Sequence, residues 1–124
     1  MSARVPAREA VLMEIIRKPY LILHVRKKYF DEINAGVKDH EYRRESPYWT
    51  RRLSGPPGQG ITYDLVLIAC GYPKKKDPGK WIAFRYNGYH YMPIQHPEFG
   101  PEPVQVYAVS VHPDQRTELP PGWI

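Results

Sequence analysis

The sequence contains a single cysteine and no long hydrophobic run. Cys70 stands alone among 124 residues, so the chain cannot form an intramolecular disulfide. No apolar stretch approaches the roughly 20 residues that a transmembrane helix requires, and the N-terminus lacks the uninterrupted apolar segment of a secretory signal. These absences argue against a disulfide-stabilised scaffold and a membrane-spanning protein, and we expect a soluble protein in the reducing environment of the cytoplasm.

The length and the charge of the chain further restrict the class of protein. A chain of 124 residues with 42% hydrophobic content is sized for one domain. We expect this domain at residues 19–112, preceded by an N-terminal arm or short helix at 1–18 and followed by an irregular tail at 113–124. The 18 Lys and Arg residues against 13 Asp and Glu give a net charge of +5. This excess favours polyanionic partners, foremost nucleic acid, although a charge of this size also serves solubility alone.

Hydrophobic periodicity predicts an α+β fold with five to six strands, one main helix and one or two short helices. The main helix is expected to end at Gly36, which accepts a left-handed backbone, and a short helix is expected to begin after Ser46. The non-local order of the strands favours a compact mixed β-barrel over a helical bundle. The expected helices cover 27–35 and 46–53, and the expected strands cover 20–25, 38–44, 63–70, 81–86 and 103–111. Residues 55–60 and 87–101 are expected to form loops, the latter ordered and permitting short strands.

The extended segment after Gly36 carries the most distinctive polar residues. Strand alternation places Glu41 and Arg43 on the same face, close to Lys38. Such a set can grip a phosphate or recognise a base edge. It could also support catalysis, with Glu41 as general base and Lys38 or Arg43 stabilising charge on a phosphate. The simplest alternative is an ion pair between Glu41 and Arg43 that stabilises the strand.

Cations interleave with aromatic residues in several later stretches. This combination can follow a phosphate backbone while rings stack on exposed bases. Core packing of the rings and solvation of the lysine run are the structural alternatives. The histidines show no zinc-binding spacing, so no resident metal or other cofactor is expected. The candidate nucleic-acid contacts are Lys38, Glu41, Arg43, Arg44, Trp49, Arg51, Arg52, Lys74, Lys75, Arg85, Tyr86 and Tyr89.

Several of these motifs together resemble a known family. A first strand is followed by KKYFDEINAGVKDHEYR at 27–43, a strand YDLVLIACGYP at 63–73 and a late strand VQVYAVSV at 104–111. This order resembles the ASCH family of the PUA-like superfamily, in particular its small stand-alone members from phages and bacteria. Lys38, Glu41 and Arg43 stand where that family has its G-x-K-x-x-E-x-R signature, which begins here at Gly36. The segments PYW, GYPKKKD and HPEFGPEPV add to the likeness to that subgroup.

The resemblance implies a pseudo-barrel with a cleft beside the helix, lined by Lys38, Glu41 and Arg43. It implies binding of RNA, of another nucleic acid or of a modified nucleotide. Some family members are thought to cleave RNA with the help of a metal ion, and one branch removes the acetyl group from a modified cytidine.

An enzymatic role is left open by these residues. The deacetylating branch uses a Lys and a Thr three residues later, and Glu41 occupies the Thr position here without a hydroxyl. A ribonuclease is therefore expected before an acetylcytidine amidohydrolase, and it would need a divalent metal that the spacing of Asp39, Glu41 and Asp64 does not specify. A third hypothesis is a protein-interaction module whose basic face meets an acidic partner.

Overall fold

The computed structural model describes residues 14–123, and the predicted arm falls mainly outside this range. The α+β class is confirmed, with two α-helices and seven strands among the described residues. The helices are α2 (Lys27–Asn34) and α3 (Pro47–Leu53), with short 3-10 turns η1 (Pro78–Lys80), η2 (Pro97–Phe99) and η3 (Pro113–Gln115). The strands are β1 (Glu14–Val25), β2 (His40–Arg44), β3 (Gln59–Cys70), β4 (Trp81–Arg85), β5 (Tyr89–Ile94), β6 (Val104–Ser110) and β7 (Arg116–Thr117).

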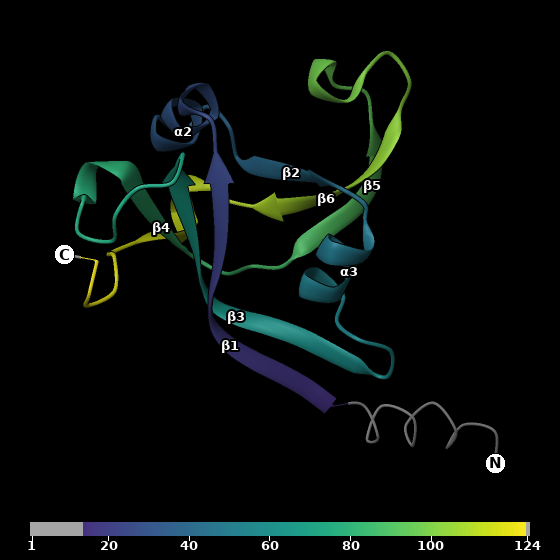
Figure 1. Cartoon of the computed structure of the whole chain (residues 1–124), viewed down its shortest axis with the longest axis horizontal. Helices are drawn as coiled ribbons and strands as arrows, with labels where there is room; N and C mark the ends of the chain where they lie inside the picture. The colour runs from purple at the N-terminus through teal and green to yellow at the C-terminus, as the bar shows by residue number, and fades with distance from the viewer. Residues whose placement is uncertain (1–13, 124) are drawn as a thin grey trace.

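The strands form two sheets (Figure 1). One has the order β1-β3-β4-β7 and the other has the order β2-β6-β5, and hydrogen bonds do not join them into a closed barrel within residues 14–123. β1 and β3 are parallel, with their register running from Glu14 opposite Gln59 to Val25 opposite Cys70. The remaining pairs are antiparallel. Both β1 and β2 are therefore edge strands, and the chain between β1 and β3 supplies α2, β2 and α3 as the crossover that a parallel pair needs.

The main hydrophobic core draws on both sheets and both helices. It joins Leu23 of β1, Ile33 of α2, Leu53 of α3, Phe84 of β4 and Val109 of β6, all of them buried. A smaller cluster lies on the opposite face of the first sheet, where alternate residues of β3 meet the C-terminal segment. The uniformly apolar run of β3 is explained by this arrangement, because its residues are buried on both faces.

Both predicted helices are confirmed, and their boundaries lie within one residue of the expected ranges. Gly36 has φ 77°, the left-handed conformation that follows many helix ends. The Oγ of Ser46 accepts a hydrogen bond from the backbone N–H of Trp49 at 3.2 Å, and Pro47 occupies the first helical position. No helix in residues 14–123 is long and apolar enough to cross a membrane.

The chain termini and loops depart from expectation. β1 begins at Glu14 rather than Tyr20, so residues 14–18 of the predicted arm belong to a strand. β3 likewise takes the end of the predicted 55–60 loop, because these two strand extensions pair with each other. The tail is not irregular throughout: η3 and β7 lie within it, and Trp123 is only 4% exposed. Its indole packs edge-on against Tyr20 and Trp81, contacts that a local pattern does not reveal.

Candidate functional site

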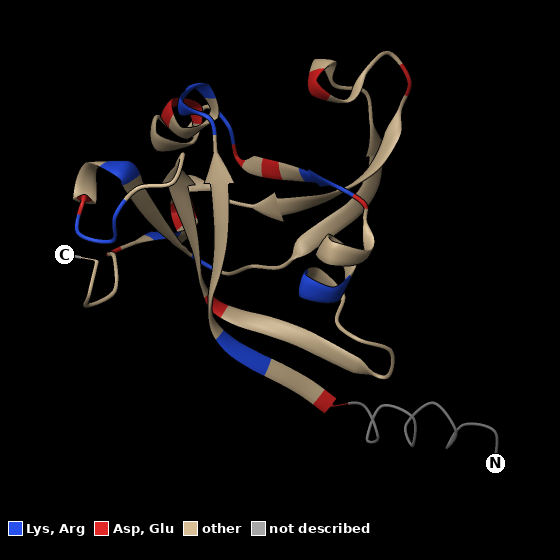
Figure 2. Ribbon diagram, in the orientation of Figure 1, with Lys and Arg blue, Asp and Glu red and all other residues tan. Residues whose placement is uncertain are grey.

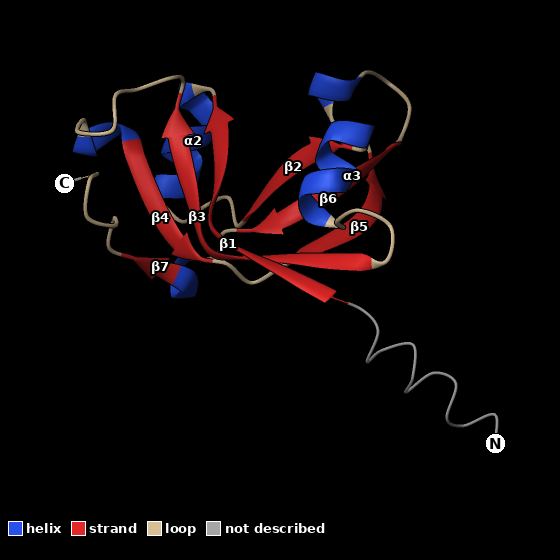
Figure 3. Cartoon of the chain, turned by 60° about the horizontal axis from the view of Figure 1, so that its bottom comes forward, coloured by secondary structure: helices blue, strands red, loops and turns tan. Residues whose placement is uncertain are grey.

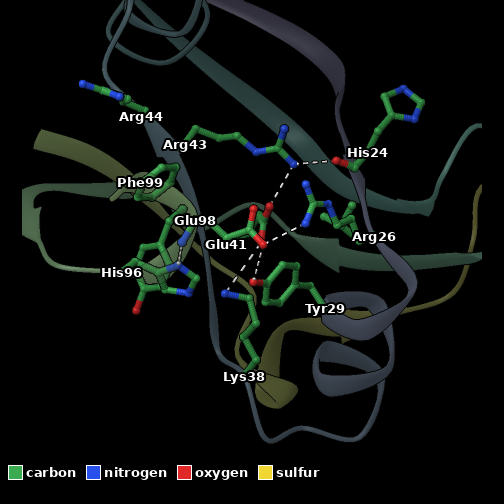
Figure 4. Close-up of a pocket in the computed structure, with 12 residues that line it drawn as sticks. His24, Arg26, Tyr29, Lys38, Glu41, Arg43, Arg44, His96, Glu98 and Phe99 are labelled. Atoms are coloured by element: carbon green, nitrogen blue, oxygen red, sulfur yellow. Dashed lines mark hydrogen bonds and ion pairs between the residues drawn. The ribbon is translucent and has the colours of Figure 1, made fainter. Parts of the chain in front are cut away.

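A cavity of about 240 Å³ lies between the C-terminal end of β1, helix α2, strand β2 and turn η2 (Figure 4). The structure brings Lys38, Glu41 and Arg43 together here, as expected, and Arg44 also lines the cavity although strand alternation places it on the opposite face of β2. Residues distant in sequence join them. The complete lining consists of His24, Val25, Arg26, Tyr29, Lys38, Glu41, Tyr42, Arg43, Arg44, His96, Glu98 and Phe99.

Glu41 is the polar centre of this cavity and is only 7% exposed. Its Oε2 accepts a hydrogen bond from Arg43 Nη2 at 2.8 Å, which confirms that the two side chains share one face of β2. Lys38 Nζ lies 3.7 Å from Oε1, and it also lies 4.5 Å from the centre of the Tyr42 ring. The Glu41 carboxylate attracts both cations, and this attraction keeps the Lys38 and Arg43 side chains directed into the cavity.

Arg43 also connects the two sheets. Its Nη2 donates to the backbone carbonyl of His24 on β1 at 2.8 Å. Its guanidinium carbon lies 5.1 Å from the Trp49 ring centre, within the range of a cation–π contact. Its Nε is buried and has no hydrogen-bond partner within the described part of the chain. The side chain is therefore held by one nitrogen and by the face of an indole.

Burial raises the pKa of the Glu41 carboxyl above its ordinary value. The positive charges of Arg43 and Lys38, and their hydrogen bonds, act in the opposite direction and offset part of that rise. A buried carboxyl with a raised pKa beside two cations is typical of functional sites as well as of structural ion pairs.

A second polar group closes the other side of the cavity. Glu98 Oε2 accepts a hydrogen bond from Arg26 Nη1 at 2.9 Å and from the Tyr29 hydroxyl at 3.1 Å. Burial, and then the bond to Glu98, raise the pKa of Tyr29. His96 orients this turn, because its Nδ1 accepts from the backbone N–H of Glu98 at 3.1 Å.

Sequence reasoning did not place Arg26, Tyr29, Tyr42, Glu98 or Phe99 in the site. Tyr29 and Tyr42 lie in the 27–43 motif, and Glu98 and Phe99 lie in the HPEFGPEPV segment. Both segments contributed to the family resemblance, but these four residues were given no role. The pair of Arg26 and Glu98 joins positions 72 residues apart, and such a pair leaves no local pattern.

The remaining candidates fall into two groups. Trp49, Arg51 and Arg52 line a second cavity of about 580 Å³ beside α3, where Trp49 also packs against the core. The other five candidates line neither cavity. Lys74 lies in the loop before η1, and Lys75 Nζ lies 4.5 Å from the Trp123 ring centre.

The last three candidates sit near the end of β4 and on β5. Arg85 donates to the backbone carbonyl of Asp114 at 3.3 Å. Tyr86 packs on the core, where burial raises its pKa to about 12. Tyr89 meets Tyr107 edge-on at 5.3 Å. The rings of Tyr86 and Tyr89 thus make packing contacts that stabilise the fold.

Charge in the first cavity is unbalanced. Four basic residues line it against two acidic ones, and Arg44 forms no ion pair among residues 14–123. Three aromatic rings, those of Tyr29, Tyr42 and Phe99, share the same space. An anionic ligand with a flat ring would satisfy both features.

No group of three or more metal-binding side chains converges within residues 14–123. No family model, curated protein or solved structure matches this chain.

Proposed function

We propose that this chain is an ASCH-type, PUA-like domain that binds RNA, or a modified nucleotide within it, in the first cavity. The observation that carries the proposal is the convergence of Lys38, Glu41 and Arg43 in one cavity with aromatic rings. The α+β architecture with helix α2 beside that cavity also supports it.

The cavity suits one nucleotide. Its volume of about 240 Å³ lies just below the ~300–1,000 Å³ typical of small-molecule pockets, so one flat ring is the natural occupant. Arg44 is exposed at the rim and is free to meet a phosphate. The Glu41 carboxylate has about four acceptor positions, so it can hold Arg43 and still accept from the amino group of a base.

Binding is tested with labelled single-stranded RNA by fluorescence anisotropy at several salt concentrations. Arg44→Gln removes one cation from the rim without breaking an ion pair. The control variant Lys76→Gln removes one cation from a residue that lines neither cavity. We expect the affinity to fall only for Arg44→Gln, with the salt slope reduced by about 0.7 for one lost phosphate contact of a single strand. An absence of RNA retention by the unaltered protein at low salt would refute the proposal and favour the protein-interaction module.

A hydrolase is the second candidate, favoured by one observation. Lys38 Nζ lies 3.7 Å from the buried Glu41 carboxyl, where it can stabilise negative charge, and burial raises the pKa of Glu41, which strengthens it as a general base. RNA cleavage that requires a divalent metal and disappears in Glu41→Gln would support a ribonuclease. Retention without cleavage supports binding alone. Deacetylation of a cytidine is disfavoured, because Glu41 provides no hydroxyl nucleophile.

A further inference from the structure

The outer edges of β1 and β2 are linked across the two sheets by the Arg43 side chain. Each of these strands is the outermost in its sheet. The hydrogen bond of Arg43 to the His24 carbonyl crosses from one edge to the other at 2.8 Å. Helix α3 follows β2 directly and lies beside the first half of β3 (Figures 1 and 3), and residues of α3, β1 and β3 together line the second cavity.

The two cavities adjoin one another at the C-terminal half of β1. His24 lines both of them. Arg43 lines the first cavity and stacks on Trp49, which lines the second. Arg43 therefore lies at the junction of the two cavities.

The second cavity has the chemistry of an anion-binding surface. Lys18, Arg51 and Arg52 line it, and no acidic side chain does so among the described residues. None of these three cations belongs to an ion pair within residues 14–123. Figure 2 shows basic residues on the lower part of β1 and at the end of α3. Unpaired cations in a groove attract a polyanion from solution.

Aromatic rings accompany these cations. The Arg52 guanidinium carbon lies 3.4 Å from the centre of the Tyr48 ring, which is 54% exposed. Trp49 and Tyr20 line the same cavity. Rings next to unpaired cations form the combination that binds single-stranded nucleic acid, in which unpaired bases are free to stack.

We propose that the second cavity holds the nucleotides next to the one in the first cavity. The ligand is then a single strand several nucleotides long, rather than a free nucleotide or a duplex. This inference rests on the proposed function. A free sheet edge can also accept a peptide strand, but the cationic lining and the exposed ring favour nucleic acid over an additional strand.

The test compares a labelled octanucleotide RNA with ribonucleoside monophosphates used as competitors, by fluorescence anisotropy. The double variant Lys18→Gln/Arg51→Gln removes two cations of the second cavity whose side chains make no hydrogen bond or ion pair within residues 14–123. The matched control Lys76→Gln/Lys80→Gln removes the same charge outside both cavities.

We expect the test variant to bind the octanucleotide about tenfold more weakly, with its salt slope lowered by about 1.4, while monophosphate binding and the control stay unchanged. Unchanged octanucleotide affinity would overturn the inference and leave the proposed function intact. The same conclusion follows if the unaltered protein binds monophosphates as tightly as the octanucleotide, and a peptide strand then becomes the better occupant. If the unaltered protein binds neither ligand, the proposed function itself fails.

Discussion

Replacement of Arg43 by methionine probes the polar centre of the first cavity. Methionine keeps an unbranched chain against Trp49 but removes the donor to Glu41 and to the His24 carbonyl. Glu41 then keeps Lys38, at 3.7 Å, as its remaining cationic partner. We expect Arg43→Met to lower the free energy of unfolding substantially while leaving the protein folded.

The size of this loss follows from burial. Removing one partner of a fully buried ion pair costs ~3–5 kcal/mol. The Arg43 side chain is 20% exposed and Lys38 remains near the same carboxylate, so the loss of the pair should cost about 2 kcal/mol. The unpaired His24 carbonyl adds about 1 kcal/mol. The total of about 3 kcal/mol is large against a typical domain stability of ~5–15 kcal/mol.

The loss should depend on pH. Burial already raises the pKa of Glu41, and loss of the Arg43 charge raises it further. A carboxyl whose folded pKa lies above its unfolded value of ~4.3 contributes stability below that value and loses it as the pH rises through the folded pKa. The deficit of Arg43→Met relative to the unaltered protein should therefore grow between pH ~4 and pH ~7.

Urea denaturation at both pH values measures these effects. Arg44→Met is the matched control, because Arg44 is exposed and forms no ion pair in the described range. The double variant Glu41→Gln/Arg43→Met should recover about 1–2 kcal/mol relative to the sum of its single variants, because the carboxylate is removed together with the guanidinium that pairs with it. Additive single effects and a deficit that does not change with pH would refute this account of the pair.

Three further predictions concern the scaffold, and thermal or urea unfolding measures each of them. Gly36→Ala should cost about 1–2 kcal/mol, because φ is 77° and the added Cβ would lie 3.2 Å from Pro113. Gly79→Ala, with open space and no positive φ, should be neutral or stabilising by up to ~1 kcal/mol, and equal losses at the two glycines would contradict the conformational argument. Ser46→Ala should cost about 1 kcal/mol through loss of the helix cap, whereas an unchanged stability would show that the cap contributes nothing. Trp123→Ala should cost about 3 kcal/mol by emptying the smaller cluster, and a loss below ~1 kcal/mol would mean that the C-terminal segment does not pack as described.

The sequence of a few neighbouring residues was sufficient to predict the features that local interactions stabilise. Hydrophobic periodicity and the stop at Gly36 predicted α2, and Ser46 predicted the start of α3. Alternation along β2 placed Glu41 and Arg43 on one face, which the 2.8 Å contact between them confirms. Such features depend on backbone conformation over a few neighbouring residues, so a short window contains the required information.

Tertiary structure alone decided where the strands extend and what completes the cavity. Residues 14–18 are mostly exposed and lack a clear apolar pattern, and they form a strand because β3 pairs with them. Arg26 meets Glu98 only because η2 folds back over the end of β1. Trp123 is buried against β1 and β4 from the far end of the chain. In each case the stabilising contact lies many residues away along the chain, and its energy becomes available only after both partners have been brought together by the rest of the fold.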